Sequence, residues 1–246
     1  MSELVTVVGL ALLPALGNFA GGLLAEFRRP SQRNLNRALH FAAGIVLAVV
    51  AVELLPRALQ NISGWLIGVL FGLGGLTYLG VQWRVERWQA SRSGHADRTG
   101  MWMVYFAVAV DLFSDGLLIG IGASVSTSLA LLLALGQLLA DAPEGFSAIA
   151  NMREKGVPRS RRMLLSAAFA IPVLAAAMGA YYLLRDRNEA VQLGGLVFVA
   201  GLLTVAAVED MLGEAHESAD DTWSSTAAMV GGFVLFTLVS AGMGDG

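Results

Sequence analysis

Eight apolar stretches fill almost the whole chain, and each is close to the roughly 20 residues that a helix needs to cross a membrane. They cover residues 4–26, 38–56, 62–83, 101–123, 128–151, 163–184, 190–210 and 224–243. Hydrophobic residues make up 56% of the 246 positions and charged residues only 14%, which excludes an ordinary soluble domain. The apolar runs are continuous, whereas the strands of a membrane barrel alternate. The sequence therefore predicts an all-α membrane protein, with eight transmembrane helices forming a single domain over residues 1–246.

Composition excludes several other classes of protein and of site. The chain has no cysteine, so disulfides and thiolate metal sites are excluded, and its net charge of −3 gives no reason to expect a nucleic-acid partner. The N-terminal segment MSELVTVVGLALL lacks a positive region before its apolar run. We therefore expect a retained first span and not a cleaved signal peptide. The expected surroundings are the lipid bilayer, in the cytoplasmic membrane of a bacterium.

Basic residues gather in alternate connections between the spans. Thirteen of the 16 lie in the first, third and fifth connections: Arg28, Arg29, Arg33, Arg37, Arg84, Arg87, Arg92, Arg98, Arg153, Lys155, Arg159, Arg161 and Arg162. Cytoplasmic loops of membrane proteins carry such an excess of Lys and Arg. We therefore expect the odd-numbered connections to face the cytoplasm and both termini to lie on the outer side.

Four acidic residues lie in the middle of two neighbouring spans. Asp111 and Asp115 are in the fourth span, and Asp141 and Glu144 are in the fifth. A charged side chain at the bilayer centre costs about 3 kcal/mol on insertion scales, so such residues are functional candidates. Spacings of i,i+4 and i,i+3 place each pair on one helix face. Because the two spans run in opposite directions, the pairs reach similar depth, and we expect all four acids to form one site.

A divalent cation is the expected ligand of these acids. Four neighbouring carboxylates cannot all ionise without a counter-charge, and no Lys or Arg lies inside any of the eight spans. Protons would replace the cation when it leaves. Oxygen ligands favour harder ions, so Mn²⁺ or Fe²⁺ should compete with Zn²⁺. Ser114, Gln137 and Ser147 are possible further ligands or hydrogen-bond partners of the acids, or they only join helices.

A proline and two glycines beside the acids affect the helix backbone and its packing. Pro143 lacks an N–H and leaves the carbonyl of Leu139 without its helical partner, which either exposes a ligand or only bends the helix. Gly116 and Gly145 each follow an acid directly. We expect them to allow close helix packing.

At these residues the chain resembles the ZIP (zinc–iron-regulated-transporter-like) metal transporters. Their fourth helix typically reads His-Asn-x-Pro-Glu-Gly, where this chain has DLFSDG at 111–116, and their fifth reads His-Glu/Asp-x-Pro-Glu-Gly, where it has ADAPEG at 140–145. The second span, HFAAGIVLAVVAVELLPRAL, and the segment VEDMLGEAHE after the seventh are also similar to the family's. The resemblance implies an eight-helix bundle with both termini outside and a metal site between the fourth and fifth helices.

The chain departs from the family at several of its ligand positions. Asp111 and Ala140 replace the two motif histidines, and Leu112 and Ser114 replace the Asn and Pro of the fourth helix. In the sixth helix, Ile171 precedes Pro172 where the family often has a Glu. These departures favour one all-oxygen site over a two-metal site.

Other polar residues mark possible mouths of a metal pathway. Glu53 lies near the outer end of the second span, and Glu209, Asp210, Glu214 and His216 lie near the inner end of the seventh. They serve metal capture and release, or they are ordinary interfacial charges, which is the preferred interpretation for Glu53. We expect His40 and His95 at the interface or in a loop. Gly64, Gly68 and Gly72 form a ridge of small residues that packs against a neighbouring helix or a second protomer of a homodimer.

The sequence thus favours a divalent-metal transporter that moves metal toward the cytoplasm, with no resident cofactor. A metal-binding membrane sensor without transport is the alternative. An intramembrane enzyme is less favoured, because the His-Glu-x-x-His motif of zinc proteases does not occur and the spans lack the basic residues that a lipid phosphatase needs.

Overall fold

The computed structural model describes residues 2–28, 31–90, 96–212 and 223–244, and all of this part of the chain is helical apart from short connections. No strand occurs within these residues, so the all-α prediction is confirmed. The helices are α1 (Ser2–Phe27), α2 (Gln32–Ala48), η1 (Val49–Leu54), α3 (Leu55–Asn61), α4 (Gly64–Ala90), α5 (Ala96–Val125), α6 (Thr127–Glu154), α7 (Arg159–Ala168), α8 (Ala170–Leu184), α9 (Glu189–Ala206), η2 (Ala207–Leu212) and α11 (Trp223–Gly244).

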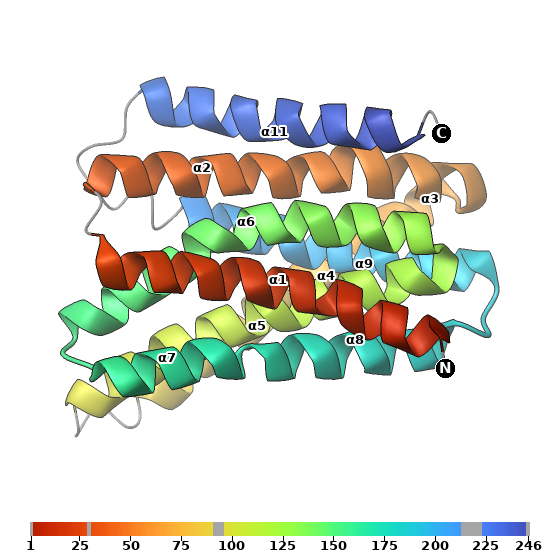
Figure 1. Ribbon diagram of the computed structural model, residues 1–246. Helices are drawn as coiled ribbons and strands as arrows, with labels where there is room; N and C mark the ends of the chain where they lie inside the picture. Colours follow the sequence, from red (N-terminus) through yellow and green to blue (C-terminus); the bar gives the residue numbers. More distant parts are fainter. Residues whose placement is uncertain (1, 29–30, 91–95, 213–222, 245–246) are drawn as a thin grey trace.

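Eight helical units of the described chain are long and apolar enough to cross a membrane. The second unit combines α2, the π-helix η1 and α3, and the sixth combines α7 and α8. All eight lie side by side in one bundle, and α1 begins at the same end of the bundle at which α11 ends (Figure 1). The eight predicted spans overlap these units, and their ends differ by seven residues at most.

Glycines bring the helices together in pairs. Added methyl groups at Gly44 of α2 and Gly232 of α11 would each overlap a backbone carbonyl of the other helix, and Gly74 of α4 and Gly201 of α9 stand in the same relation. The pairs α1–α6 and α5–α8 are packed in the same way. Backbones that touch in this manner gain van der Waals contact, which is the main source of helix association in lipid.

The apolar core lies where α2, η1, α6 and α9 meet. Its fully buried members include Ile45, Val49, Leu133, Leu196 and Leu203. Large apolar side chains also cover outward faces of the bundle, such as Trp65 on α4, 73% exposed, and Leu238 on α11, 65% exposed. Apolar surface of this extent is unfavourable in water and favourable in lipid. The fold is therefore that of an integral membrane protein.

Candidate metal centre

A one-residue connection sets α5 and α6 side by side in opposite directions. Helix α5 ends at Val125 and α6 begins at Thr127. Between them Ser126 has extended backbone angles, and its hydroxyl accepts a hydrogen bond of 3.1 Å from the N–H of Leu129, so it caps α6. Asp111 and Asp141 each lie 15 positions from Ser126, which is roughly 22 Å of helix on either side of the connection. The two acids therefore reach the same depth.

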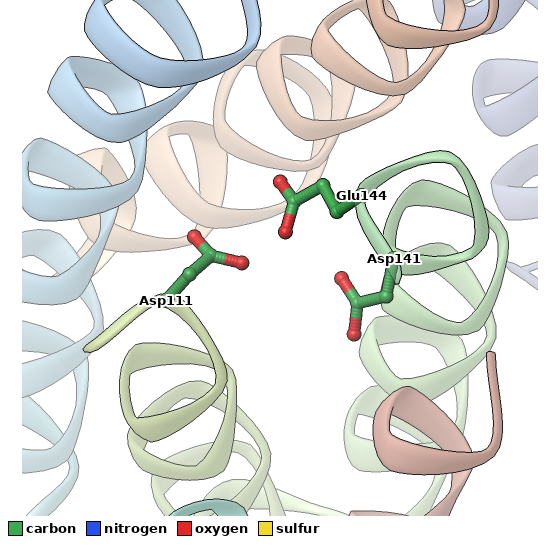
Figure 2. Close-up of side chains that lie close together, drawn as sticks. All are labelled: Asp111, Asp141 and Glu144. Atoms are coloured by element: carbon green, nitrogen blue, oxygen red, sulfur yellow. The ribbon is translucent and has the colours of Figure 1, made fainter. Parts of the chain in front are cut away.

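Three of the four predicted acids meet in one place. Ligand oxygens of Asp111, Asp141 and Glu144 all lie within 4.8 Å of one another. Their carboxylates point toward each other across the space between α5 and α6 (Figure 2). Asp111 is 6% exposed and Asp141 only 1%, while Glu144 is half-buried. Oxygens no more than 4.8 Å apart can share a cation, because calcium- and magnesium-type ligands stand 2.0–2.6 Å from the ion.

Asp115 lies beside this group of three and is not part of it. It is fully buried, its Oδ1 accepts a hydrogen bond from Nε2 of Gln137, and its carboxyl lies next to that of Asp141. The prediction of one site on two helices therefore corresponds to a three-acid cluster with a fourth carboxyl adjoining it. Gln137, which the sequence suggests as a partner of the acids, lies against Asp115.

Several buried oxygens of these side chains have no hydrogen-bond partner among the described residues. They are both carboxylate oxygens of Asp141, Oδ2 of Asp115 and Oε1 of Gln137. No described Lys or Arg forms an ion pair with Asp111, Asp115 or Asp141. An unpaired buried charge is strongly unfavourable, so these carboxyls need either protons or a cation. These carboxyls can therefore exchange protons for a cation.

Glycine packing holds both acid-bearing helices in place. A methyl group at Gly116 would overlap the carbonyl of Val173 on α8, and one at Gly145 would overlap the carbonyl of Asn18 on α1. The expected packing role of both glycines is confirmed. Pro143 lies inside α6, which continues through it from Thr127 to Glu154.

The two serines near the acids are engaged within their own helices. The hydroxyl of Ser114 donates a hydrogen bond of 2.8 Å to the carbonyl of Val110, and the hydroxyl of Ser147 accepts one of 3.3 Å from the side chain of Asn151. Both serines are buried. The bond from Ser114 to its own helix favours the helix-bonding alternative for this residue.

The predicted mouth residues differ in their surroundings. Glu53 is 6% exposed, forms a 2.9 Å ion pair with Arg57 and accepts a hydrogen bond from Ser240 of α11. Glu53 is therefore covered by protein on η1, and its interpretation as an interfacial charge stays a prediction. Glu209 is exposed on η2. The side chain of Asp210, together with Glu214, His216 and His95, lies outside the residues whose placement the structure describes.

His40 and Asn18 are among the buried polar residues that are not predicted from the sequence. His40 is only 3% exposed, and its Nδ1 lies 2.9 Å from the carbonyl oxygen of Asn36. It belongs to α2 and not to a loop, and its expected position at the interface stays a prediction. It is buried because α2 packs against α6, η2 and α11. Asn18 of α1 is completely buried. Each is a single polar residue in or beside an apolar stretch. Such a stretch does not show which face of its helix is covered by other helices.

Comparisons of the chain with models of known protein families and with curated proteins find no match. The resemblance to the ZIP transporters therefore rests on the motifs and their positions.

Proposed function

We propose that this protein transports a divalent metal cation across the membrane, in the manner of a divergent ZIP-type transporter. One observation carries the proposal: three carboxylates converge near the middle of two antiparallel helices, in a bundle of helices long and apolar enough to cross a membrane. Intramembrane acids mark ion pathways and proton relays far more often than structural positions, because their burial is costly. The cation is the substrate here, and no resident cofactor is proposed.

The chemistry of the cluster favours hard or borderline divalent ions. Its ligand atoms are carboxylate oxygens, and no described His or Cys belongs to it. Carboxylates suit Mn²⁺ and Fe²⁺ as well as Zn²⁺, whereas imidazole and thiolate would select zinc or copper. We propose Mn²⁺, Fe²⁺ or Zn²⁺ as the transported ion.

The proposed direction of transport is toward the cytoplasm. It follows from the family resemblance, while the excess of Lys and Arg in the odd-numbered connections supports the orientation with both termini outside. A homodimer is a further possibility that the ridge of Gly64, Gly68 and Gly72 supports. No atom of the described chain approaches within 4 Å of a methyl group placed on any of the three, so the ridge is open to another molecule.

An enzymatic role has less support. The residues Gly242-Met243-Gly244-Asp245 match the Gly-x-Gly-Asp pattern of intramembrane aspartyl proteases. They stand at the end of α11, and Asp245 lies outside the described residues. The acids that do converge belong to α5 and α6.

Flux into proteoliposomes tests the proposal directly. Purified protein is reconstituted around a metal-sensitive dye, Mn²⁺, Fe²⁺ or Zn²⁺ is added outside, and the dye signal is followed. Uptake that requires Asp141 and Glu144 supports transport. Metal binding without flux would indicate the sensor instead, and absence of both would refute the proposal.

A further inference from the structure

Asn18 of α1 is a polar side chain that no protein group satisfies within the described structure. The residue is 0% exposed, and neither its Oδ1 nor its Nδ2 has a hydrogen-bond partner among the described residues. Buried side-chain amides are nearly always hydrogen-bonded, because burial without a partner costs free energy. The exception therefore indicates a partner outside the described residues, such as a bound ion or water molecule.

The depth of Asn18 in the bundle matches that of the acidic cluster. Helix α1 packs backbone to backbone on α6, where the backbone of Asn18 meets Gly145 and Gly21 meets the carbonyl of Ala142. Ala142 directly follows Asp141, and Gly145 directly follows Glu144. Asn18 is therefore level with the turn of α6 that carries both cluster acids.

The side chain of Asn18 lies on the interior face of α1. Three residues earlier, Ala15 packs with Leu112 of α5 and with Phe169 and Val173 of the sixth span. Residues three apart in a helix share one face, so Asn18 is directed toward the same interior and away from lipid. Leu112 directly follows Asp111. Oδ2 of Asp115 on α5 and both carboxylate oxygens of Asp141 on α6 are likewise buried without a hydrogen-bond partner among the described residues.

We propose that Asn18 is a ligand-binding residue of the carboxylate site, so that α1 contributes to the site together with α5 and α6. With a cation bound, Oδ1 of Asn18 binds the ion or a water molecule in its shell, and Nδ2 donates a hydrogen bond to a carboxylate of the cluster. A neutral amide adds an oxygen ligand without adding to the repulsion between the acids. This inference rests on the proposed function, since it names a further residue of the same site.

The exchange Asn18→Leu separates a ligand role from a structural one. Leucine has nearly the same size and no polar atoms, so it removes the unsatisfied amide. Purified protein is studied by thermal unfolding without metal and by calorimetric titration with Mn²⁺. We expect the metal-free variant to unfold at the wild-type temperature or above it, because no hydrogen bond is lost. Mn²⁺ affinity should fall by about 10- to 100-fold, as for other residues that support metal ligands.

A second variant and two controls complete the test. Asn18→Asp keeps an oxygen and adds a carboxyl, so it should bind Mn²⁺ and release more protons on binding than wild type. If Asn18→Leu does not fold, proton release by Asn18→Asp on Mn²⁺ binding tests the role of Asn18 instead. Asn61→Leu, at an exposed residue at the end of α3, controls for the added apolar side chain. Asp141→Asn shows how far Mn²⁺ affinity falls when an acid of the cluster is lost.

Each outcome has a distinct meaning. Wild-type Mn²⁺ affinity in Asn18→Leu, or wild-type proton release in Asn18→Asp, would overturn the role of Asn18 while leaving the proposed function intact. Wild-type protein that binds no Mn²⁺ would instead overturn the proposed function and this inference together.

Discussion

Replacing Gly145 by alanine should push α6 away from α1 and weaken metal binding at the proposed site. A methyl group at this position would overlap the carbonyl of Asn18. To reach an ordinary carbon contact of about 3.5 Å, the two helices would have to separate by more than about 1 Å. Overpacking of this kind typically costs 1–3 kcal/mol. Metal sites tolerate deviations of only about 0.2 Å in ligand distance, so Mn²⁺ affinity should fall at least tenfold.

Gly68→Ala is the matched control for Gly145→Ala. Nothing in the described chain lies within 4 Å of a methyl group at Gly68, which is exposed on α4. Both exchanges gain the same helix propensity, up to about 1 kcal/mol. The two variants should therefore differ by the overpacking cost alone, at roughly 2–4 °C in Tm per kcal/mol for a chain of this size. Thermal unfolding in detergent and Mn²⁺ titration measure both effects. Equal Tm and equal Mn²⁺ affinity in the two variants would refute the packing argument.

Three further predictions concern the acids themselves. Asp141→Asn and Glu144→Gln should each abolish uptake into proteoliposomes, because each replaces a charged ligand by a neutral amide of the same size. Neither should lower the Tm of the metal-free protein; Asp141 forms no ion pair with a described Lys or Arg that the exchange would remove. Normal uptake by both would show that the acids are structural. Lowering the external pH should weaken uptake, because protons and metal compete for the same oxygens; titrations in buffers of different ionisation enthalpy should show proton release between about pH 5 and 7, and its absence would contradict the exchange. Asp111→His should shift preference from Mn²⁺ toward Zn²⁺, while Asp111→Asn removes the same charge without adding imidazole. Identical metal preference in these two variants, or a hundredfold Zn²⁺ preference in wild type, would count against the all-oxygen site.

Local features of the sequence determine the spans and the depth of the acids. Hydrophobic length alone defines the eight helical units, because a bilayer admits helices of a narrow range of lengths. The equal depth of Asp111 and Asp141 follows from their equal distance to Ser126, since the rise of a helix per residue is constant. Helical periodicity likewise places the two acids of each pair on one face.

Tertiary structure alone decides which polar groups meet. Glu53 accepts a hydrogen bond from Ser240, which lies 187 positions further along the chain. Asp115 accepts a hydrogen bond from Gln137. Asp111 instead lies close to Asp141 and Glu144. Asn18 and His40 are buried because other helices cover their faces. In an apolar span every face is hydrophobic enough to meet either lipid or protein, so the sequence of one helix does not indicate its covered side. That side is determined by contacts between residues far apart in sequence, where glycines let particular pairs of helices approach.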